Sequence, residues 1–397
     1  MHKTSNRKPT IAIAGAGPAG SSIAILLSKA GFNVSLVEKA AFPRHKLCGE
    51  FVSPECLSHF EELGVSEKLH PFSSEKIVST TFYSLDGASA SVPTKWFSGG
   101  EFGAIGLSRY TMDEVLFRHA EEAGAEVLEE CAVKGVTFDG ETPNGFLCKG
   151  KDGEVFELAS DILVDATGRG ASIVSMARKE RGLGIKPEKP KWVGFKAHFA
   201  GTINPPGVCE IYFFNGGYGG VNFVENGDAN VCFLVRSDVA REYGGDAGAV
   251  FEKCLLENPR AAEVLGSGKQ SFAWIAVSVP GFGMGSPANF GNMFAVGDAA
   301  SFIDPFTGSG ILLALESGKL FSQAVINSAD YKNISDVYTR LYRKEFTSRL
   351  KISSMMRTLA NSEKFTNVGV KTLSRITPLL RLLARGTRGG VFRPRQT

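Results

Sequence analysis

The chain has 397 residues, of which 43% are hydrophobic and 21% are charged, and its net charge is +3. This length exceeds one ordinary hydrophobic core and predicts two joined domains. The composition is that of a globular protein, and we expect no nucleic-acid partner. The seven cysteines form no C-x-x-C pair, so we expect no metal site and no disulfide framework, but reduced thiols in a cytoplasmic protein. No apolar run reaches the roughly 18 residues of a membrane-spanning helix.

Apolar periodicity and turn residues predict alternating strands and helices along the chain. The first unit is a strand at 10–14, a helix at 19–30 and a strand at 33–38. After a loop at 41–52, the patterns predict a helix at 54–63, strands within 76–106, a helix at 110–123, short strands up to 164, a strand-rich zone at 190–280, a strand at 294–296, and helices at 308–327, 334–360 and 378–385.

A glycine-rich turn follows the first strand and opens the first helix. It reads Gly15-Ala-Gly17-Pro18-Ala19-Gly20. Gly15 permits the tight turn, Gly17 lets a pyrophosphate approach the backbone, and Gly20 lets helix and strand pack closely. Glu38 ends the second strand, where a carboxylate accepts hydrogen bonds from ribose hydroxyls and repels a 2′-phosphate. The unit therefore predicts a dinucleotide site that prefers FAD or NAD to NADP.

A second small-residue turn, Asp165-Ala-Thr167-Gly168-Arg169, follows the apolar strand that ends at Val164. Such a turn suits a phosphate or ribose that passes close to the backbone. By itself it is barely more specific than a generic turn.

A third segment selects between the two dinucleotides. Gly297-Asp298 follows a strand, and Pro305 to Ile311 leads into the next helix. Asp298 can bind the ribityl hydroxyls of a flavin. The free N–H groups of Gly308, Ser309, Gly310 and Ile311 suit the N1/O2 edge of a reduced flavin, where negative charge accumulates. NAD has no such edge, so this segment predicts FAD.

Arg109 precedes the helix at 110–123 and is a candidate to reach the cofactor phosphates, although a surface role is the alternative. The remaining candidate cofactor contacts are Lys39, Arg44, Cys48, Gly49 and Val133.

The order and spacing of these segments resemble a large flavoprotein superfamily. It includes aromatic-ring hydroxylases, geranylgeranyl reductases and flavin-dependent halogenases, and the resemblance covers about residues 10–330. It implies an α/β fold in which a Rossmann-type FAD-binding domain carries an inserted mixed β-sheet substrate domain, followed by C-terminal helices. We expect the FAD-binding domain at 1–75, 108–185 and 285–330, the substrate domain at 76–107 and 186–284, and a helical region with a basic tail at 331–397.

The segment Pro43-Arg44-His-Lys46-Leu-Cys48-Gly49-Glu50 looks most like the geranylgeranyl-reductase branch, in which a Cys-Gly pair lies near the isoalloxazine. This implies a flavin contact or a catalytic role for Cys48, with a small apolar filler as the alternative. Glu50 replaces the commoner Gly. Tyr218 is the second catalytic candidate, because it is the residue of the branch's aromatic strand motif that this chain retains.

The chain also lacks motifs that are typical of each branch of the superfamily, which weakens its resemblance to any one of them. The rest of the reductases' aromatic strand motif is missing, as are the W-x-W-x-I-P motif of halogenases and the Asp-Gly of hydroxylases, whose place Thr167-Gly168 takes. We expect monooxygenation of an apolar or aromatic small molecule, with double-bond reduction as the alternative. A halogenase, or a non-catalytic binding protein on the same fold, is less favoured. No second G-x-G-x-x-G occurs, so NAD(P)H is expected to visit transiently as the electron donor.

The C-terminal segment 365–397 has seven Lys or Arg and no Asp or Glu. Within it, Thr377 looks like an N-cap, with Pro378 at the first helical position and Gly386 beyond the end. A short basic amphipathic helix of this kind can bind an anionic bilayer. We therefore expect peripheral membrane contact through 371–388, with a solvated basic terminus as the alternative.

Overall fold

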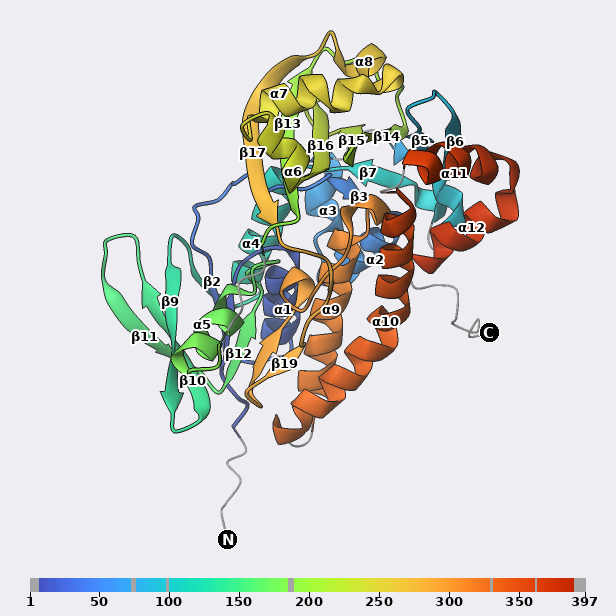
Figure 1. The fold of residues 1–397 in the computed structure, drawn as a ribbon. Helices are drawn as coiled ribbons and strands as arrows, with labels where there is room; N and C mark the ends of the chain where they lie inside the picture. The colour runs from blue at the N-terminus through green and yellow to red at the C-terminus, as the bar shows by residue number, and fades with distance from the viewer. Residues whose placement is uncertain are drawn as a thin grey trace, which may run out of the picture.

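In the computed structural model, a six-stranded sheet forms the base of the molecule (Figure 1). The structure describes residues 7–72, 76–97, 100–184, 189–328, 331–360 and 363–388. The strand order is β19 (Ala288–Asn289), β20 (Met293–Ala295), β12 (Ile162–Asp165), β1 (Ile11–Ala14), β2 (Val34–Val37) and β8 (Glu126–Leu128). All neighbours are parallel except β19 and β20. Because parallel strands are buried on both faces, their sequences are continuous apolar runs.

Side chains that alternate along β1 divide this sheet between two layers. Ile11 and Ile13 pack against helices, whereas Ala12 and Ala14 face a three-stranded meander and one helix. The helical layer is α1 (Pro18–Lys29), α2 (Pro54–Leu63), α3 (Ser66–Leu69), α4 (Arg109–Glu122), α9 (Gly310–Ile326) and α10 (Ile334–Ala360); the other layer is β9 (Ala132–Asp139), β10 (Thr142–Lys149), β11 (Val155–Ala159) and α5 (Ser172–Glu180). This arrangement leaves the carboxyl ends of the strands as an edge, where α/β proteins bind ligands.

A larger mixed sheet lies over that edge. Its strand order is β17 (Lys269–Val279), β13 (Trp192–Ala200), β16 (Ala229–Arg236), β15 (Gly217–Phe223), β14 (Val208–Phe214), β5 (Ser79–Tyr83) and β6 (Ser89–Pro93). The pair β14 and β5 is parallel, and the others are antiparallel. One face packs against α6 (Ser237–Glu242), α7 (Ala247–Lys253) and α8 (Pro259–Leu265). The opposite face is directed at the ends of the parallel strands.

Short strands connect the two parts. β3 (Phe51–Val52), β7 (Ala104–Gly106) and β4 (Lys76–Ile77) form one small sheet, and β18 (Gly283–Met284) pairs with β21 (Ser301–Phe302). Between 76 and 107, β5 and β6 therefore join the large sheet, while β7 pairs with both β3 and β4. The fold class predicted from sequence is confirmed, and the residue boundaries of the two domains stay a prediction.

The C-terminal helices lie beside the edge strand β6 of the large sheet (Figure 1). After α10 come α11 (Glu363–Arg375) and α12 (Thr377–Gly386). The expectation that Thr377 caps the last helix was wrong, because Ile376 precedes the helix and makes no side-chain cap, while Thr377 and Gly386 lie inside it. Residues 389–397 of the expected basic tail lie outside the described residues.

Other elements went unpredicted. Helices α6 to α8 interrupt the zone expected to be strand-rich, and α11 fills the interval between two expected helices. α6 to α8 have six or seven residues each, too short for a clear apolar periodicity, so their packing on the sheet determines them. Among the described residues, no helix combines the length and apolar character required to cross a membrane.

Candidate active site

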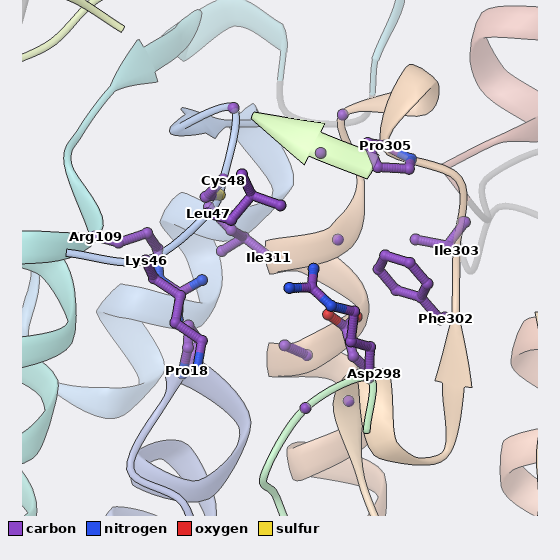
Figure 2. A pocket seen from close by; sticks show the side chains of 18 of the residues that line it. Pro18, Lys46, Leu47, Cys48, Arg109, Asp298, Phe302, Ile303, Pro305 and Ile311 are labelled. Atoms are coloured by element: carbon purple, nitrogen blue, oxygen red, sulfur yellow. The ribbon is translucent and has the colours of Figure 1, made fainter. Parts of the chain in front are cut away.

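A cavity of about 740 Å³ lies between the parallel sheet and the large mixed sheet. Nearly all predicted cofactor and catalytic residues line it: Gly15, Gly17, Pro18, Ala19, Glu38, Lys39, Arg44, Cys48, Gly49, Arg109, Val133, Thr167, Gly168, Tyr218, Gly297, Asp298, Pro305, Gly308, Gly310 and Ile311. Figure 2 shows Cys48 and Arg109 on one side of this cofactor cavity and Asp298 across from them. Gly20 and Ser309 are not among the lining residues.

The first glycine turn requires its glycines. Gly15 has a φ of +102°, and a Cβ there would lie 2.5 Å from the carbonyl oxygen of Ala166. A Cβ on Gly20 would lie 1.9 Å from the carbonyl oxygen of Gly15, so Gly20 acts through packing behind the cavity wall. Gly17 precedes α1 and makes no side-chain cap. The first N–H groups of α1 are therefore free to bind an anion.

A chain of ion pairs between acidic and basic side chains lies beside this turn. Glu38 accepts hydrogen bonds from the backbone N–H groups of Ala16 (3.0 Å) and Ala40 (3.1 Å). Arg44 joins Glu38 (3.2 Å) to the buried Asp113 (2.8 Å). Arg109 donates to the same carboxylate at 2.6 and 2.7 Å. Its Nη2 also lies 3.4 Å from the position of a Cβ on Gly17, so the guanidinium is directed at the glycine turn.

The second turn is organised by hydrogen bonds to the side chain of Asp165. The buried Asp165 accepts hydrogen bonds from the N–H and Oγ1 of Thr167 and from the N–H groups of Ile173 and Val174 at the start of α5. Gly168 has a φ of +87°. The Asp165 hydrogen bonds therefore fix the turn that places Thr167 and Gly168 on the cavity wall.

The third segment contributes the carboxyl group of Asp298 and the N-terminal end of helix α9 to the cavity. Burial raises the pKa of Asp298 to about 6, although Arg109, Arg169 and Lys46 oppose this shift by their charge. A carboxyl group buried in this way requires polar partners, which the hydroxyls of a ribityl chain would supply. Helix α9 begins at Gly310 without a side-chain cap, because the Ser309 hydroxyl interacts with Thr307 Oγ1 (2.7 Å).

The loop with Cys48 and Glu50 is fixed by residues of the large sheet. Glu50 is fully buried and has a φ of +52°. Its carboxylate forms an ion pair with Lys196 Nζ and a hydrogen bond with His198 Nε2 (2.8 Å), and it accepts the backbone N–H of Arg109 (2.7 Å). We call Glu50, Lys196 and His198 the Glu50 network.

The Glu50 network keeps the carboxylate ionised. Burial raises the pKa of Glu50, but the His198 hydrogen bond and the Lys196 charge outweigh it, and the pKa lies below its usual value. Left-handed backbone costs a non-glycine residue about 1–2 kcal/mol. The buried ion pair with Lys196 offsets this strain at Glu50.

The sequence analysis missed Lys196, His198 and Asp113 as parts of the site. Lys196 and His198 alternate with Phe195, Ala197 and Phe199 on β13, so they share the face opposite the apolar core of the large sheet. Two polar residues at strand spacing inside an apolar run are the signal that could have identified them.

Comparisons with known proteins identify the family of the chain. The model of the FAD binding domain family matches residues 8–319. The chain belongs to this family. It is 25% identical to tryptophan 2-halogenase of Chondromyces crocatus over 85% of this chain and 65% of that protein. It is 28% identical to digeranylgeranylglycerophospholipid reductase of Methanosarcina acetivorans, over 84% of this chain and 80% of that protein.

A triple mutant of the flavin-dependent brominase Bmp2 has the same fold, with a TM-score of 0.78, 20% identity and coverage of 97% of this chain and 96% of that one. The chain spans slightly less than two thirds of the length of the first curated relatives it matches. The chain thus contains the FAD binding domain of this family.

The residues present fit FAD. The glycine turn and the free end of α1 suit the diphosphate, Glu38 the ribose, Asp298 the ribityl chain and the start of α9 the flavin ring. These individual roles stay predictions, which the following substitution addresses.

Replacing Gly20 with Ala should weaken FAD binding. The added methyl meets the Gly15 carbonyl, and relieving the overlap costs about 1–3 kcal/mol, or about tenfold in affinity per 1.4 kcal/mol. The flavin content of the purified protein and its FAD dissociation constant measure the effect. Gly184→Ala is the control, because nothing lies within 4 Å of its Cβ position. Equal FAD affinity in both variants would contradict the role of the turn.

The Glu50 network makes stability depend on pH. Since the folded pKa of Glu50 is depressed, its contribution is complete above the unfolded pKa of about 4.3 and is lost as pH falls through the folded pKa. Glu50→Gln should lower the free energy of unfolding at pH 7 by about 3–5 kcal/mol, because Lys196 stays buried without its partner. The substitution should also reduce the fall in the free energy of unfolding with decreasing pH (the acid limb), as measured by urea unfolding at several pH values. The exposed Glu67→Gln should change neither, and an unchanged acid limb in Glu50→Gln would refute the assignment.

Proposed function

We propose that the chain is an NAD(P)H-linked FAD monooxygenase acting on an apolar, aromatic small molecule. The observation that carries this proposal is an aromatic wall of the cofactor cavity, formed by Phe82, Phe213, Tyr218 and Phe306. These rings contact one another at 5.3 to 6.5 Å between centroids. Aromatic pairs contribute about 0.5–1.5 kcal/mol beyond area burial, so the wall favours a planar aromatic ligand.

An aromatic substrate supports oxygenation over reduction. Hydride addition to an aromatic ring destroys its delocalisation, whereas oxygen insertion at a ring C–H preserves it. The balanced reaction converts the C–H substrate, O₂, NAD(P)H and a proton into the C–OH product, water and NAD(P)⁺. When bound and reduced, FAD supplies two electrons and activates oxygen. The chain contributes a dry, apolar cavity that orients the ring and excludes water.

Tyr218 is the polar group on the aromatic wall. Its hydroxyl donates to the buried Asp304, which lies behind the wall. Burial, and then the Asp304 charge, raise the pKa of Tyr218 well above its usual value, so the phenol keeps its proton. Its oxygen is then free to accept a hydrogen bond from a substrate hydroxyl. This contact would place a phenolic ring against Phe306.

Double-bond reduction is the second candidate, and the placement of Cys48 favours it. Cys48 lines the cofactor cavity, and its Sγ accepts the N–H of Glu50 at 3.3 Å. Burial raises the pKa of Cys48, so the thiol holds a proton. In this reaction Cys48 Sγ–H would give its proton to one carbon of the double bond, a bound reduced flavin would supply the hydride for the other, and solvent would restore the thiol. The reductase relative named above supports this alternative.

Product analysis distinguishes the two reactions. Oxygenation under ¹⁸O₂ should place one heavy oxygen in a phenolic test substrate, and Tyr218→Phe should lower kcat/KM by about 10- to 100-fold, the effect of about 1–3 kcal/mol for an unmade hydrogen bond. Mass spectrometry and steady-state kinetics measure these outcomes, with the exposed Tyr110→Phe as control. A product that gains two hydrogens and no oxygen, in an isoprenoid or other alkene, would establish reduction instead.

We also propose that α11 and α12 contact an anionic membrane surface. Ile376, Leu379 and Leu382 expose 43%, 40% and 54% of their surface, with Arg375 and Arg381 exposed beside them. Apolar insertion combined with basic side chains is the pattern that binds anionic lipid. On the other side of α12, Leu380 and Leu383 line the cofactor cavity. The helix would therefore lie between the membrane, from which an apolar substrate would enter, and the cavity that receives it.

Liposome co-sedimentation measures this contact. Leu379→Ser with Leu382→Ser should reduce binding to phosphatidylglycerol vesicles, because it removes about 0.8 kcal/mol per inserted methylene. A protein that ends at residue 365 would test the contact less well than these substitutions, because the truncation also removes the side chains of α12 that line the cofactor cavity. Val155→Ser, at a 59% exposed residue on β11, is the matched control. Equal sedimentation of both variants, or none for the unaltered protein, would exclude the contact.

A further inference from the structure

A second cavity, of about 420 Å³, adjoins the cofactor cavity. We call it the basic cavity. Arg169 and Phe302 line both cavities, so a ligand in the basic cavity would lie next to one in the cofactor cavity. Its lining residues are Arg169, Lys191, Trp192, Pro280, Gly281, Phe282, Phe302 and Arg357.

The basic cavity carries three cations and no lining carboxylate. Lys191 is exposed at its mouth, and no ion pair of Arg169 is found among the described residues. Arg357 approaches Asp304 only at 3.8 Å and donates to Ser354 Oγ at 3.1 Å. The Asp298 charge acts on Arg169 from the cofactor cavity, but burial dominates and lowers the pKa of Arg169. Three basic side chains without a carboxylate in the lining therefore favour a multiply charged anion.

Aromatic rings orient the two guanidinium groups. Phe282 and Phe302 stack at 5.1 Å with an interplanar angle of 24°. Arg357 lies over Phe282 at 4.9 Å, and Arg169 lies over Phe302 at 5.9 Å. Rings that cover the guanidinium faces leave the N–H edges to bind oxyanions, and the neighbouring Trp192 offers a further planar surface.

We infer that the basic cavity binds the diphosphate of the pyridine nucleotide that reduces the flavin. This inference rests on the proposed NAD(P)H link. The chain has one G-x-G-x-x-G turn, which serves FAD, so a second dinucleotide must be bound by other means. Arg169, Lys191 and Arg357 match a diphosphate in charge, and the wall shared through Phe302 brings the nucleotide to the edge of the flavin site. The exposed mouth at Lys191 suits a ligand that binds and leaves in each turnover.

Titration calorimetry of the FAD-bound, full-length protein with NADP⁺, NAD⁺ and inorganic pyrophosphate tests the inference without turnover. Lys191→Gln and Arg357→Gln should each raise the nucleotide Kd about tenfold or more, as expected for one charged hydrogen bond. Pyrophosphate should compete with the nucleotide, and added salt should weaken both. Lys149→Gln, an exposed lysine at the end of β10, should leave the Kd unchanged.

Anaerobic flavin reduction separates this inference from the proposed function. Lys191→Gln should slow reduction by subsaturating NAD(P)H while reduction by dithionite stays unchanged. If NAD(P)H reduces the flavin equally well in the unaltered protein, Lys191→Gln and Arg357→Gln, the basic cavity is not the nucleotide site, although the donor is correct. Weaker binding of an acidic substrate in these variants, with unchanged nucleotide Kd, would assign the cavity to the substrate. If neither nucleotide reduces the flavin, the proposed donor itself is wrong.

Discussion

The buried carboxylate of Glu50 is the contact on which the arrangement of the site depends. It belongs to the loop of Cys48 and Gly49, and its partners Lys196 and His198 belong to the large sheet. A buried charge without partners costs several kcal/mol, so separation of the loop from the sheet is strongly disfavoured. Asn222 and Asn230 reinforce the contact by donating to the carbonyl oxygens of Glu50 (3.4 Å) and Cys48 (3.2 Å).

The contact between Glu50 and the large sheet holds two layers of the fold together, and both layers line the cofactor cavity. The parallel sheet presents the ends of its strands, with the glycine turns and Asp298, and the large sheet supplies Phe82, Phe213 and Tyr218 of the aromatic wall. Helix α12 completes the enclosure, since Arg388 beyond its end is buried, donates to the carbonyl oxygen of Thr307 at 2.9 Å and lies over the Phe97 ring at 4.3 Å. An apolar enclosure of this kind would exclude water from a flavin bound in the cavity.

Local features were predictable from the sequence, and long-range ones were not. The turn at Gly15–Gly20 and the start of α9 depend on residues adjacent in the chain, and their patterns predicted the elements to within a few residues. By contrast, Glu50 and Lys196 are separated by 146 positions, and one sequence carries no direct signal for such a pairing. The basic cavity draws on separate segments around Arg169, Lys191, Phe282, Phe302 and Arg357, which only the folded chain brings together.

The FAD dissociation constant of Lys196→Met tests the central claim most directly. Lys196 is fully buried on β13 and does not line the cofactor cavity, so it can affect FAD only through Glu50 and the Cys48 loop. The account predicts clearly weaker FAD binding, measured by fluorescence titration under conditions where the variant is folded. A folded Lys196→Met protein that binds FAD as tightly as the unaltered chain would show that the large sheet does not fix the flavin loop, and would contradict the account.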